Sequence, residues 1–143
     1  MTYSRRDLTL LLPALIAAQA GAVDSVLPSR CYPFDSLPLK TDPKTHIESR
    51  QVFKGETHAG VPIDMHITTL GPGQMPHPPH QHVHEELMMI QQGKLEFTIM
   101  GKSTTVGAGS VAYVHSNELH GLKNVGDSPA QYFVLAIGRE KNS

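Results

Sequence analysis

The sequence has one cysteine, no tryptophan and a net charge of only −1 over 143 residues. The single cysteine, Cys31, cannot form an internal disulfide, so the fold depends on side-chain packing and on any bound metal. We assign Cys31 no functional role. There is no basic run or basic stripe, which argues against nucleic acid as a partner. The length predicts one domain with one hydrophobic core.

Long apolar runs are also missing. The apolar stretch at residues 8–18 is interrupted by Pro13 and is shorter than the roughly 18 to 20 residues of a membrane-spanning helix. Arg5 and Arg6 precede it and small residues follow it, which is the layout of a secretory signal peptide. We expect residues 1–22 to be a signal peptide cleaved after Ala20 or Ala22, with no stable membrane insertion after cleavage. An uncleaved membrane anchor and an amphipathic first helix are the alternatives.

The stretch SRRDL at residues 4–8 resembles the twin-arginine export signal, although Thr9 and Leu10 replace the Leu-Lys that usually follows. This resemblance implies a periplasmic or secreted protein. The twin-arginine route carries folded proteins, often with a cofactor already inserted. That order of events would suit a protein that must acquire a cofactor before it is exported.

Helical periodicity is absent after the signal. Residues 23–46 are polar and proline-rich, which predicts an extended arm. From residue 47 to residue 140, strand-like runs such as VPIDMHITTL, KLEFTIM and SVAYVHS alternate with turn residues. Many short strands at regular spacing predict an all-β sandwich or barrel. In the runs ELMMI and QYFVLAIG, odd-numbered and even-numbered positions are both mostly apolar, so we expect both faces of these strands to be covered.

The stretch PHPPHQHVHEELMMIQQG, residues 76–93, is rich in histidine and glutamate. Residues two apart in a strand point to the same side at about 6.6 to 6.8 Å along the chain, so His80 and His82 can converge on one ion. Glu86 has the same parity, and His120 could be brought across by another strand. These donors predict a divalent metal site. A histidine-rich metal sponge is the weaker alternative, because it gives His120 no role.

The same residues match the first signature of the cupins, G-x5-H-x-H-x3,4-E-x6-G. His80, His82, Glu86 and Gly93 are all in place, and only the leading glycine is displaced, because Gly73 lies one position early.

The second signature, G-x5-P-x-G-x2-H-x3-N, is matched by Gly109, His120 and Asn124. His115 stands where the proline is usual, and Asn117 stands where the second glycine is usual. Asparagine is one of the few residues besides glycine that tolerates a positive φ, so we expect the turn to survive at Asn117.

Over about residues 70–137 the sequence thus resembles the cupin superfamily. The resemblance implies an all-β cupin jelly-roll barrel (a double-stranded β-helix) at residues 47–140, a small-molecule ligand or substrate, and a homodimer. It also implies a divalent ion, Mn, Fe, Ni, Cu or Zn, held by three histidines and one glutamate, which are His80, His82, Glu86 and His120. A cupin barrel that has lost its metal is the alternative.

Residues near the predicted ligands receive other interpretations. His84 and Glu85 fall in an HxHxHEE arrangement in which neither is usually a ligand, and His77 is expected at the surface. Met88 and Ile90 share the ligands' parity and should line the cavity, whereas Leu87 and Met89 should pack outward on the second sheet. The candidates for a general acid or base are His66, Tyr113, His115 and Glu96.

A divalent ion with three neutral imidazoles and one carboxylate has a net charge of +1, which favours a small oxygen-bearing anion or a chelating carbonyl compound. Our leading hypothesis is a metal-dependent enzyme, either a dioxygenase-type oxidoreductase or an isomerase or lyase. The alternative is a non-catalytic module that binds a small ligand or metal, because the fold does not decide the function.

Overall fold

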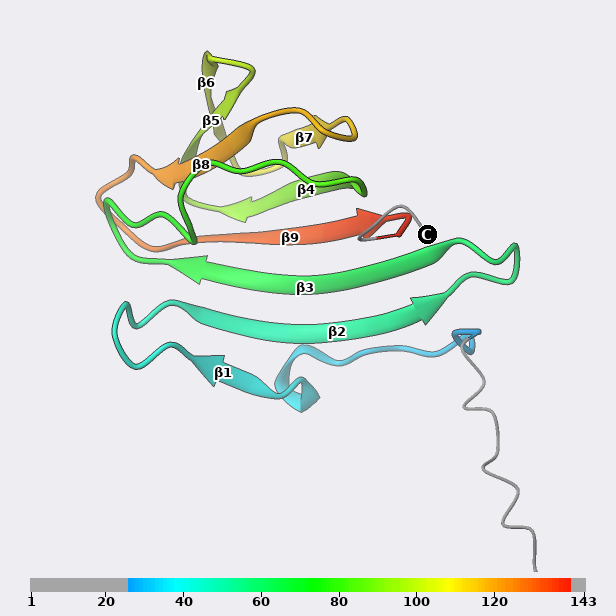
Figure 1. Ribbon diagram of the computed structural model, residues 1–143. Helices are drawn as coiled ribbons and strands as arrows, with labels where there is room; N and C mark the ends of the chain where they lie inside the picture. Colours follow the sequence, from blue (N-terminus) through cyan, green and yellow to red (C-terminus); the bar gives the residue numbers. More distant parts are fainter. Residues whose placement is uncertain (1–25, 140–143) are drawn as a thin grey trace, which may run out of the picture.

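The computed structural model describes residues 26–139, so the predicted signal peptide at residues 1–22 lies outside the described residues. Figure 1 shows the described chain as strands with one short 3-10 turn, η1 (Phe34–Ser36). The strands are β1 (Leu39–Thr41), β2 (Glu48–Glu56), β3 (Pro62–Leu70), β4 (Glu85–Gln92), β5 (Lys94–Ile99), β6 (Lys102–Gly107), β7 (Val111–Val114), β8 (His120–Asn124) and β9 (Ala130–Ile137). Over the same residues, no helix has the length and apolar character needed to cross a membrane.

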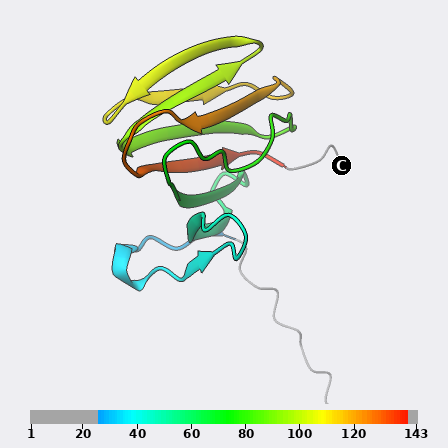
Figure 2. The same ribbon diagram turned by 90° about the vertical axis from the view of Figure 1, so that its left-hand side faces the viewer.

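The strands form two antiparallel sheets. One sheet has six strands in the order β1-β2-β3-β9-β4-β7, and the other has three in the order β6-β5-β8. Figures 1 and 2 both show the smaller sheet beside the β4 end of the larger one. β9, the last strand of residues 26–139, lies between β3 and β4, as the non-sequential pairing of a jelly roll requires. The predicted all-β jelly-roll class is confirmed.

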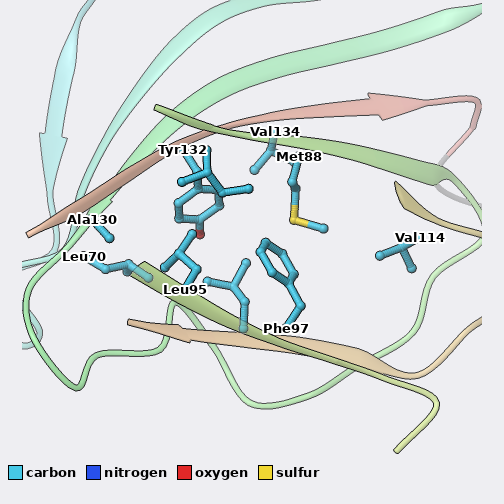
Figure 3. Close-up of a cluster of buried hydrophobic side chains, with 10 residues drawn as sticks. Leu70, Met88, Leu95, Phe97, Val114, Ala130, Tyr132 and Val134 are labelled. Carbon is cyan, nitrogen blue, oxygen red and sulfur yellow. The ribbon is translucent and has the colours of Figure 1, made fainter. Parts of the chain in front are cut away.

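The hydrophobic core lies between the two sheets (Figure 3). Leu95 and Phe97 of the smaller sheet cluster with Met88, Tyr132 and Val134 of the larger one. Burial alternates along β9, where Tyr132 and Val134 are buried and their neighbours are only half-buried, because successive side chains of a strand point to opposite faces. The barrel interior is therefore filled by one face of each sheet.

On β4, the predicted placement of side chains is confirmed for the inner face and is wrong in part for the outer face. Met88 and Ile90 are buried, as predicted. Leu87 and Met89 point outward, but they remain half-buried and do not pack on the second sheet, which covers the opposite face. The outer sides of β4 and β9 are therefore only partly covered by residues 26–139.

The predicted arm contributes an edge strand to the larger sheet. β1 pairs with β2 in antiparallel register. Just before it, Leu37 is buried, and Arg50 Nη1 on β2 donates a hydrogen bond of 2.6 Å to the Leu37 carbonyl oxygen. These contacts fix residues 37–41 against β2.

Asn124 anchors the long connection between β3 and β4. Its side chain is fully buried, and Nδ2 donates to the carbonyl oxygens of Leu70 and Ser128 at 3.0 and 2.9 Å. Its backbone N–H donates to the carbonyl oxygen of Gln74, and its own carbonyl accepts from Gly73 N–H. One asparagine thus joins the end of β3, the start of the connection and the turn after β8.

Gly93, the last residue of the first signature, forms the tight turn between β4 and β5. Its φ is +84°, and a Cβ at this position would lie 2.5 Å from both Cα and Cβ of Ala130. Gly101, in the turn between β5 and β6, has a similar φ of +79° but open space where a Cβ would point. The two positions therefore share the backbone requirement and differ in steric room.

This difference gives a test of the fold. We expect Gly101→Ala to lower the free energy of unfolding by about 1 to 2 kcal/mol, the cost of a left-handed alanine. Gly93→Ala should cost about 1 to 3 kcal/mol more, because backbone atoms near residue 130 must also move. Urea unfolding of both variants measures the difference, and equal losses would contradict the close approach at Ala130.

Candidate metal centre

The backbones of His80 and His120 are hydrogen-bonded directly to each other. His80 N–H donates to His120 O, and His120 N–H donates to His80 O, each at 2.9 Å. His120 begins β8, whereas His80 belongs to the connection between β3 and β4, and they meet as an isolated antiparallel bridge. The bridge holds the two imidazole rings with their centroids 4.6 Å apart.

His82 is held by the turn before β8. Asn117 N–H donates to the His82 carbonyl oxygen at 2.7 Å. The φ of Asn117 is 63°, which confirms that asparagine supplies the positive φ where the signature usually has glycine. The His82 ring centroid lies 4.8 Å from that of His120 and 5.1 Å from that of His80. Both signatures therefore contribute to one cluster.

The backbone that carries these residues differs from the sequence prediction. His80, His82 and Glu86 do not share one strand, since β4 begins at Glu85 and the chain bends at residues 83 and 84. The alternation of side chains along a strand therefore does not explain why His82 and Glu86 face the same cluster. The prolines at positions 76, 78 and 79 lack a backbone N–H, which disfavours a regular ladder just before His80.

The three histidines present unpartnered nitrogens to one another. His80, His82 and His120 each place a potential ligand atom within 4.8 Å of the others. His80 Nδ1, His82 Nε2 and His120 Nε2 are buried and make no hydrogen bond within residues 26–139. An unsatisfied buried polar atom costs about 1 to 3 kcal/mol. A divalent ion would accept these lone pairs, so the residues present fit a metal.

Hydrogen bonds to the backbone set the tautomers of two of these rings. His82 Nδ1 lies 2.8 Å from the carbonyl oxygen of His84, and His120 Nδ1 lies 2.9 Å from that of Glu118. A carbonyl oxygen can only accept, so Nδ1 carries the proton, and Nε2 of each neutral ring keeps a free lone pair. Metal-binding histidines in proteins are typically oriented in this way.

Glu86 lies on the side of the cluster formed by His82, His84 and His120. Its Oε1 is 3.3 Å from His82 Nε2 and 3.5 Å from His84 Nε2, and its Oε2 is 3.5 Å from His120 Nε2. His82, His84 and Glu86 form a second group whose potential ligand atoms lie within 4.8 Å of one another. The structure thus joins Glu86 to two of the predicted histidine ligands and also brings in His84.

Burial in this cluster changes the protonation of His80. Desolvation, followed by the nearby positive potential of His77, His120 and His82, lowers the pKa of His80 to about 4, and Glu86 opposes the shift. The His80 imidazole therefore stays neutral at pH values where a free histidine would be half protonated, near 6.5. A neutral imidazole is the form that binds metal.

A cavity of about 100 Å³ adjoins the cluster between the sheets. Glu86 and His120 form part of its wall. The remaining lining residues come from β3, β4, β8, β9 and the connection before β4, and they are His66, Thr68, Pro76, His77, Met88, Gly121, Leu122, Tyr132 and Val134. The candidate centre thus adjoins a space that has room for a small ligand.

Of the candidates for a general acid or base, the structure brings His66 to this cavity. Burial is the main reason that the pKa of His66 is lowered, with a partial offset from Asp64. Tyr113 is half exposed on the outer face, where a hydrogen bond with Glu85 raises its pKa. His115 is exposed in the turn after β7, and Glu96 alternates with buried Leu95 and Phe97, so both lie away from the cavity lining.

The sequence predicted no ligand role for two further histidines that the structure places at the site. The ring of His84 stacks on that of His82 with centroids 3.6 Å apart, so it lies directly beside a predicted ligand. His77 is exposed, as predicted, but its ring meets His80 edge-on at 4.1 Å and lines the cavity. No periodic signal places either residue, because both belong to irregular backbone before β4.

Comparisons with known proteins agree with this architecture. The cupin domain family matches residues 66–137. No curated protein matches the chain in sequence. Among solved structures, a predicted oxalate decarboxylase from Thermotoga maritima is similar with a TM-score of 0.65 and 17% identity, over 77% of this chain and 100% of that one.

Two further structures show how widely this fold is used. A RmlC-like cupin from Shewanella frigidimarina has a TM-score of 0.63 and 14% identity, over 79% of this chain and 95% of that one. The polyketide cyclase RemF from Streptomyces resistomycificus has a TM-score of 0.62 and 15% identity, over 81% and 83% of the two chains. At these identities the likeness concerns the fold alone.

The paired sheets and the converging histidines define a small β-barrel protein with a candidate metal centre. Because the family match spans half of the sequence, from strand β3 to strand β9, the chain belongs to the cupin family. The fold and the three-histidine group together suggest metal binding.

Alanine variants of His80 and His84 distinguish the two ligand groups, because each of these residues belongs to only one group, whereas His82 belongs to both. We expect His80→Ala to reduce bound metal to a small fraction of the parent level. His82→Ala should do the same, because each variant removes a donor. His84→Ala should barely change it. Elemental analysis of the purified variants gives metal per chain, and a larger loss in His84→Ala than in His80→Ala would assign the ion to the His82, His84 and Glu86 group instead.

Proposed function

We propose that this cupin is a metal-dependent enzyme, either a dioxygenase-type oxidoreductase or an isomerase or lyase, acting on a small oxygenated metabolite. The observation that carries the proposal is the meeting of unpartnered histidine nitrogens with a cavity that has room for a small ligand. A purely structural metal site would need the converging nitrogens but would not need a cavity beside them.

His80, His82, Glu86 and His120 would hold the ion. When bound, such an ion polarises a carbonyl or carboxylate oxygen and favours negative charge on it. The chain supports this chemistry in two ways. The carbonyls of His84 and Glu118 keep the Nδ1 protons of His82 and His120 in place, so that the Nε2 lone pairs stay directed into the cluster.

The rest of the cavity wall would bind and orient the metabolite. Met88, Leu122 and Val134 supply an apolar surface that limits water around the reacting group. His66 is the residue on this wall best suited to hold or move a proton, because one imidazole nitrogen donates and the other accepts in its neutral form.

Elemental analysis followed by activity measurement tests the proposal. We expect close to one transition-metal ion per chain in protein purified from its native compartment. The loaded protein should consume dioxygen, or convert substrate without it, when given a panel of small carbonyl and phenolic compounds, and His120→Ala should abolish turnover. Metal at full occupancy with tight ligand binding but no turnover would favour the non-catalytic binding module, and metal far below one per chain would contradict both functions.

We also propose that the protein is exported by the twin-arginine route and works as a homodimer. The N-terminal sequence motif supports export. The half-buried outer residues of β4 and β9, next to the more exposed Val111 and Tyr113, supply an apolar surface for a second copy. Intact mass and light scattering of the exported protein should give a chain starting after Ala20 or Ala22 and twice its mass. A full-length chain would contradict cleavage and export, and a monomer would contradict the homodimer.

A further inference from the structure

The larger sheet has a second hollow, on the face turned away from the metal centre. Successive side chains of a strand point to opposite faces of the sheet. On β3, His66 and Thr68 line the cavity beside the metal centre, whereas Ile67 and Thr69 line a groove on the opposite face. The thickness of the sheet therefore separates this groove from the candidate metal centre.

The arm and four neighbouring strands form the groove. It reaches from Leu39 on β1 to Gln131 on β9, and Phe34 of η1 lines it as well. Figure 1 shows β1 and β2 at the edge of the larger sheet that lies farthest from the smaller sheet. The groove is open to solvent, since Phe34 and Leu39 expose 42% and 47% of their surface. Its volume of about 160 Å³ has room for an aromatic ring, because a cavity of about 150 Å³ in another protein holds one benzene.

Arg50 is the positively charged group of this groove. Its side chain is half-buried, its Cζ lies 4.7 Å from the centre of the Phe34 ring, and Nη1 donates a hydrogen bond of 2.6 Å to the Leu37 carbonyl oxygen. Within residues 26–139 it forms no ion pair with a carboxylate. An arginine has several N–H donors and stays charged at physiological pH. The contacts with the arm thus fix the guanidinium in the groove and leave N–H groups available to an anion.

Thr69 supplies a second donor beside Arg50. Its Oγ1 accepts a hydrogen bond of 2.9 Å from Gln131 Nε2, and its own O–H makes no hydrogen bond within residues 26–139. Arg50 pairs with Ile67, and Glu48 pairs with Thr69, so Arg50 and Thr69 are diagonal neighbours on one face of β2 and β3. Diagonal neighbours lie about 7 to 8 Å apart, which allows both side chains to reach one carboxylate.

Charge and polarity specify the chemical class of a ligand. The guanidinium fork matches the two oxygens of a carboxylate. Phe34, Leu39 and Ile67 add an apolar surface, which favours a ligand with an apolar body. Glu48 lines the same groove, and its negative charge opposes a doubly charged head group such as a phosphate monoester. A monocarboxylate with an apolar ring or chain satisfies all three conditions.

We propose that this groove is a second ligand-binding site, separate from the metal centre, for an organic monocarboxylate with an apolar ring or chain. Arg50 binds the carboxylate, Thr69 donates a hydrogen bond to it, and Phe34 and Ile67 contact the apolar part. The site does not depend on the proposed metal centre. The structural role of Arg50, which ties Leu37 to β2, uses one N–H donor and is compatible with ligand binding.

Benzoate titrations followed by NMR test the site residue by residue. The exported chain is purified with Zn²⁺, which is diamagnetic and leaves the amide signals sharp. We expect benzoate to shift the amide signals of Arg50, Ile67, Thr69 and Gln131. Benzamide has the same ring without the charge and should bind about tenfold more weakly or worse. Shifts confined to the residues of the metal cavity, or equal affinities for benzoate and benzamide, would overturn the proposal.

Phenyl phosphate tests the preference for a single charge. It should bind more weakly than benzoate, because Glu48 repels its second charge. Glu48→Gln removes that repulsion and should narrow the difference between the two ligands. Phenyl phosphate binding more tightly than benzoate in the parent protein would overturn the carboxylate assignment.

Variants of Arg50 test the residue that binds the carboxylate. Arg50→Gln should weaken benzoate binding about tenfold or more, because it removes a charge-assisted hydrogen bond. Arg50→Lys keeps the charge without the planar fork and should recover part of the loss. The matched control is Lys40→Gln, which removes the same charge from β1. Lys40 follows Leu39 on the strand and points to the opposite face, so this variant should bind benzoate as the parent does.

A further variant keeps the test valid if loss of Arg50 loosens the arm. Thr69→Val preserves the shape of the side chain and the contacts of Arg50 with the arm, and it should weaken benzoate binding about threefold or more. Parent-like affinity in both Arg50→Gln and Thr69→Val would contradict the site.

A second copy of the chain is the other possible occupant of the groove. Light scattering of Arg50→Gln shows whether the homodimer persists. If this variant is monomeric and benzoate shifts no groove residue of the parent protein, the groove belongs to the interface between copies and the proposal is overturned.

Discussion

The pair of backbone hydrogen bonds between His80 and His120 is the contact on which the site depends. It ties an irregular connection to the first residue of β8, and it brings two imidazole rings from separate signatures to a centroid separation of 4.6 Å. The Asn117 contact then adds His82, and Asn124 fixes the start of the same connection. Because these restraints are mainly backbone hydrogen bonds, the geometry of the cluster does not rely on the side chains that would bind metal.

Burying several imidazole nitrogens together is unfavourable unless something binds them. Without an ion, each unsatisfied nitrogen loses its hydrogen bonds to water, and protonation is opposed by desolvation, as the lowered pKa of His80 shows. The surrounding jelly roll offsets this cost through its packed core. The buried histidine cluster is thus locally unfavourable, and the stability of the apolar core keeps it in place. This situation is common at binding and catalytic sites.

The barrel also controls what can reach the cluster. Its inner face alternates between core residues and the few polar groups of the cavity, so that His66 and Glu86 approach the same space from strands β3 and β4, with β9 between them. Glu86 and His120 of the cluster line this space together with His66. Fold similarity to proteins as different as a predicted oxalate decarboxylase and a polyketide cyclase shows that the barrel itself does not select the reaction. Selection has to come from residues such as His66 that line this particular cavity.

The sequence by itself determined the all-β class, the strands from residue 47 onward and the convergence of His80, His82 and His120, because strand alternation and turn residues are local signals and the two signatures record a known spacing. It also placed Met88 and Ile90 inside and assigned the positive φ to Asn117. Only the tertiary structure decided that His80 and His82 precede β4, that His84 stacks on His82, and that His66 faces the cavity whereas Tyr113 faces outward. These features depend on strand register and on irregular backbone, where hydrogen bonds between residues far apart in the chain, and not local periodicity, set the direction of each side chain.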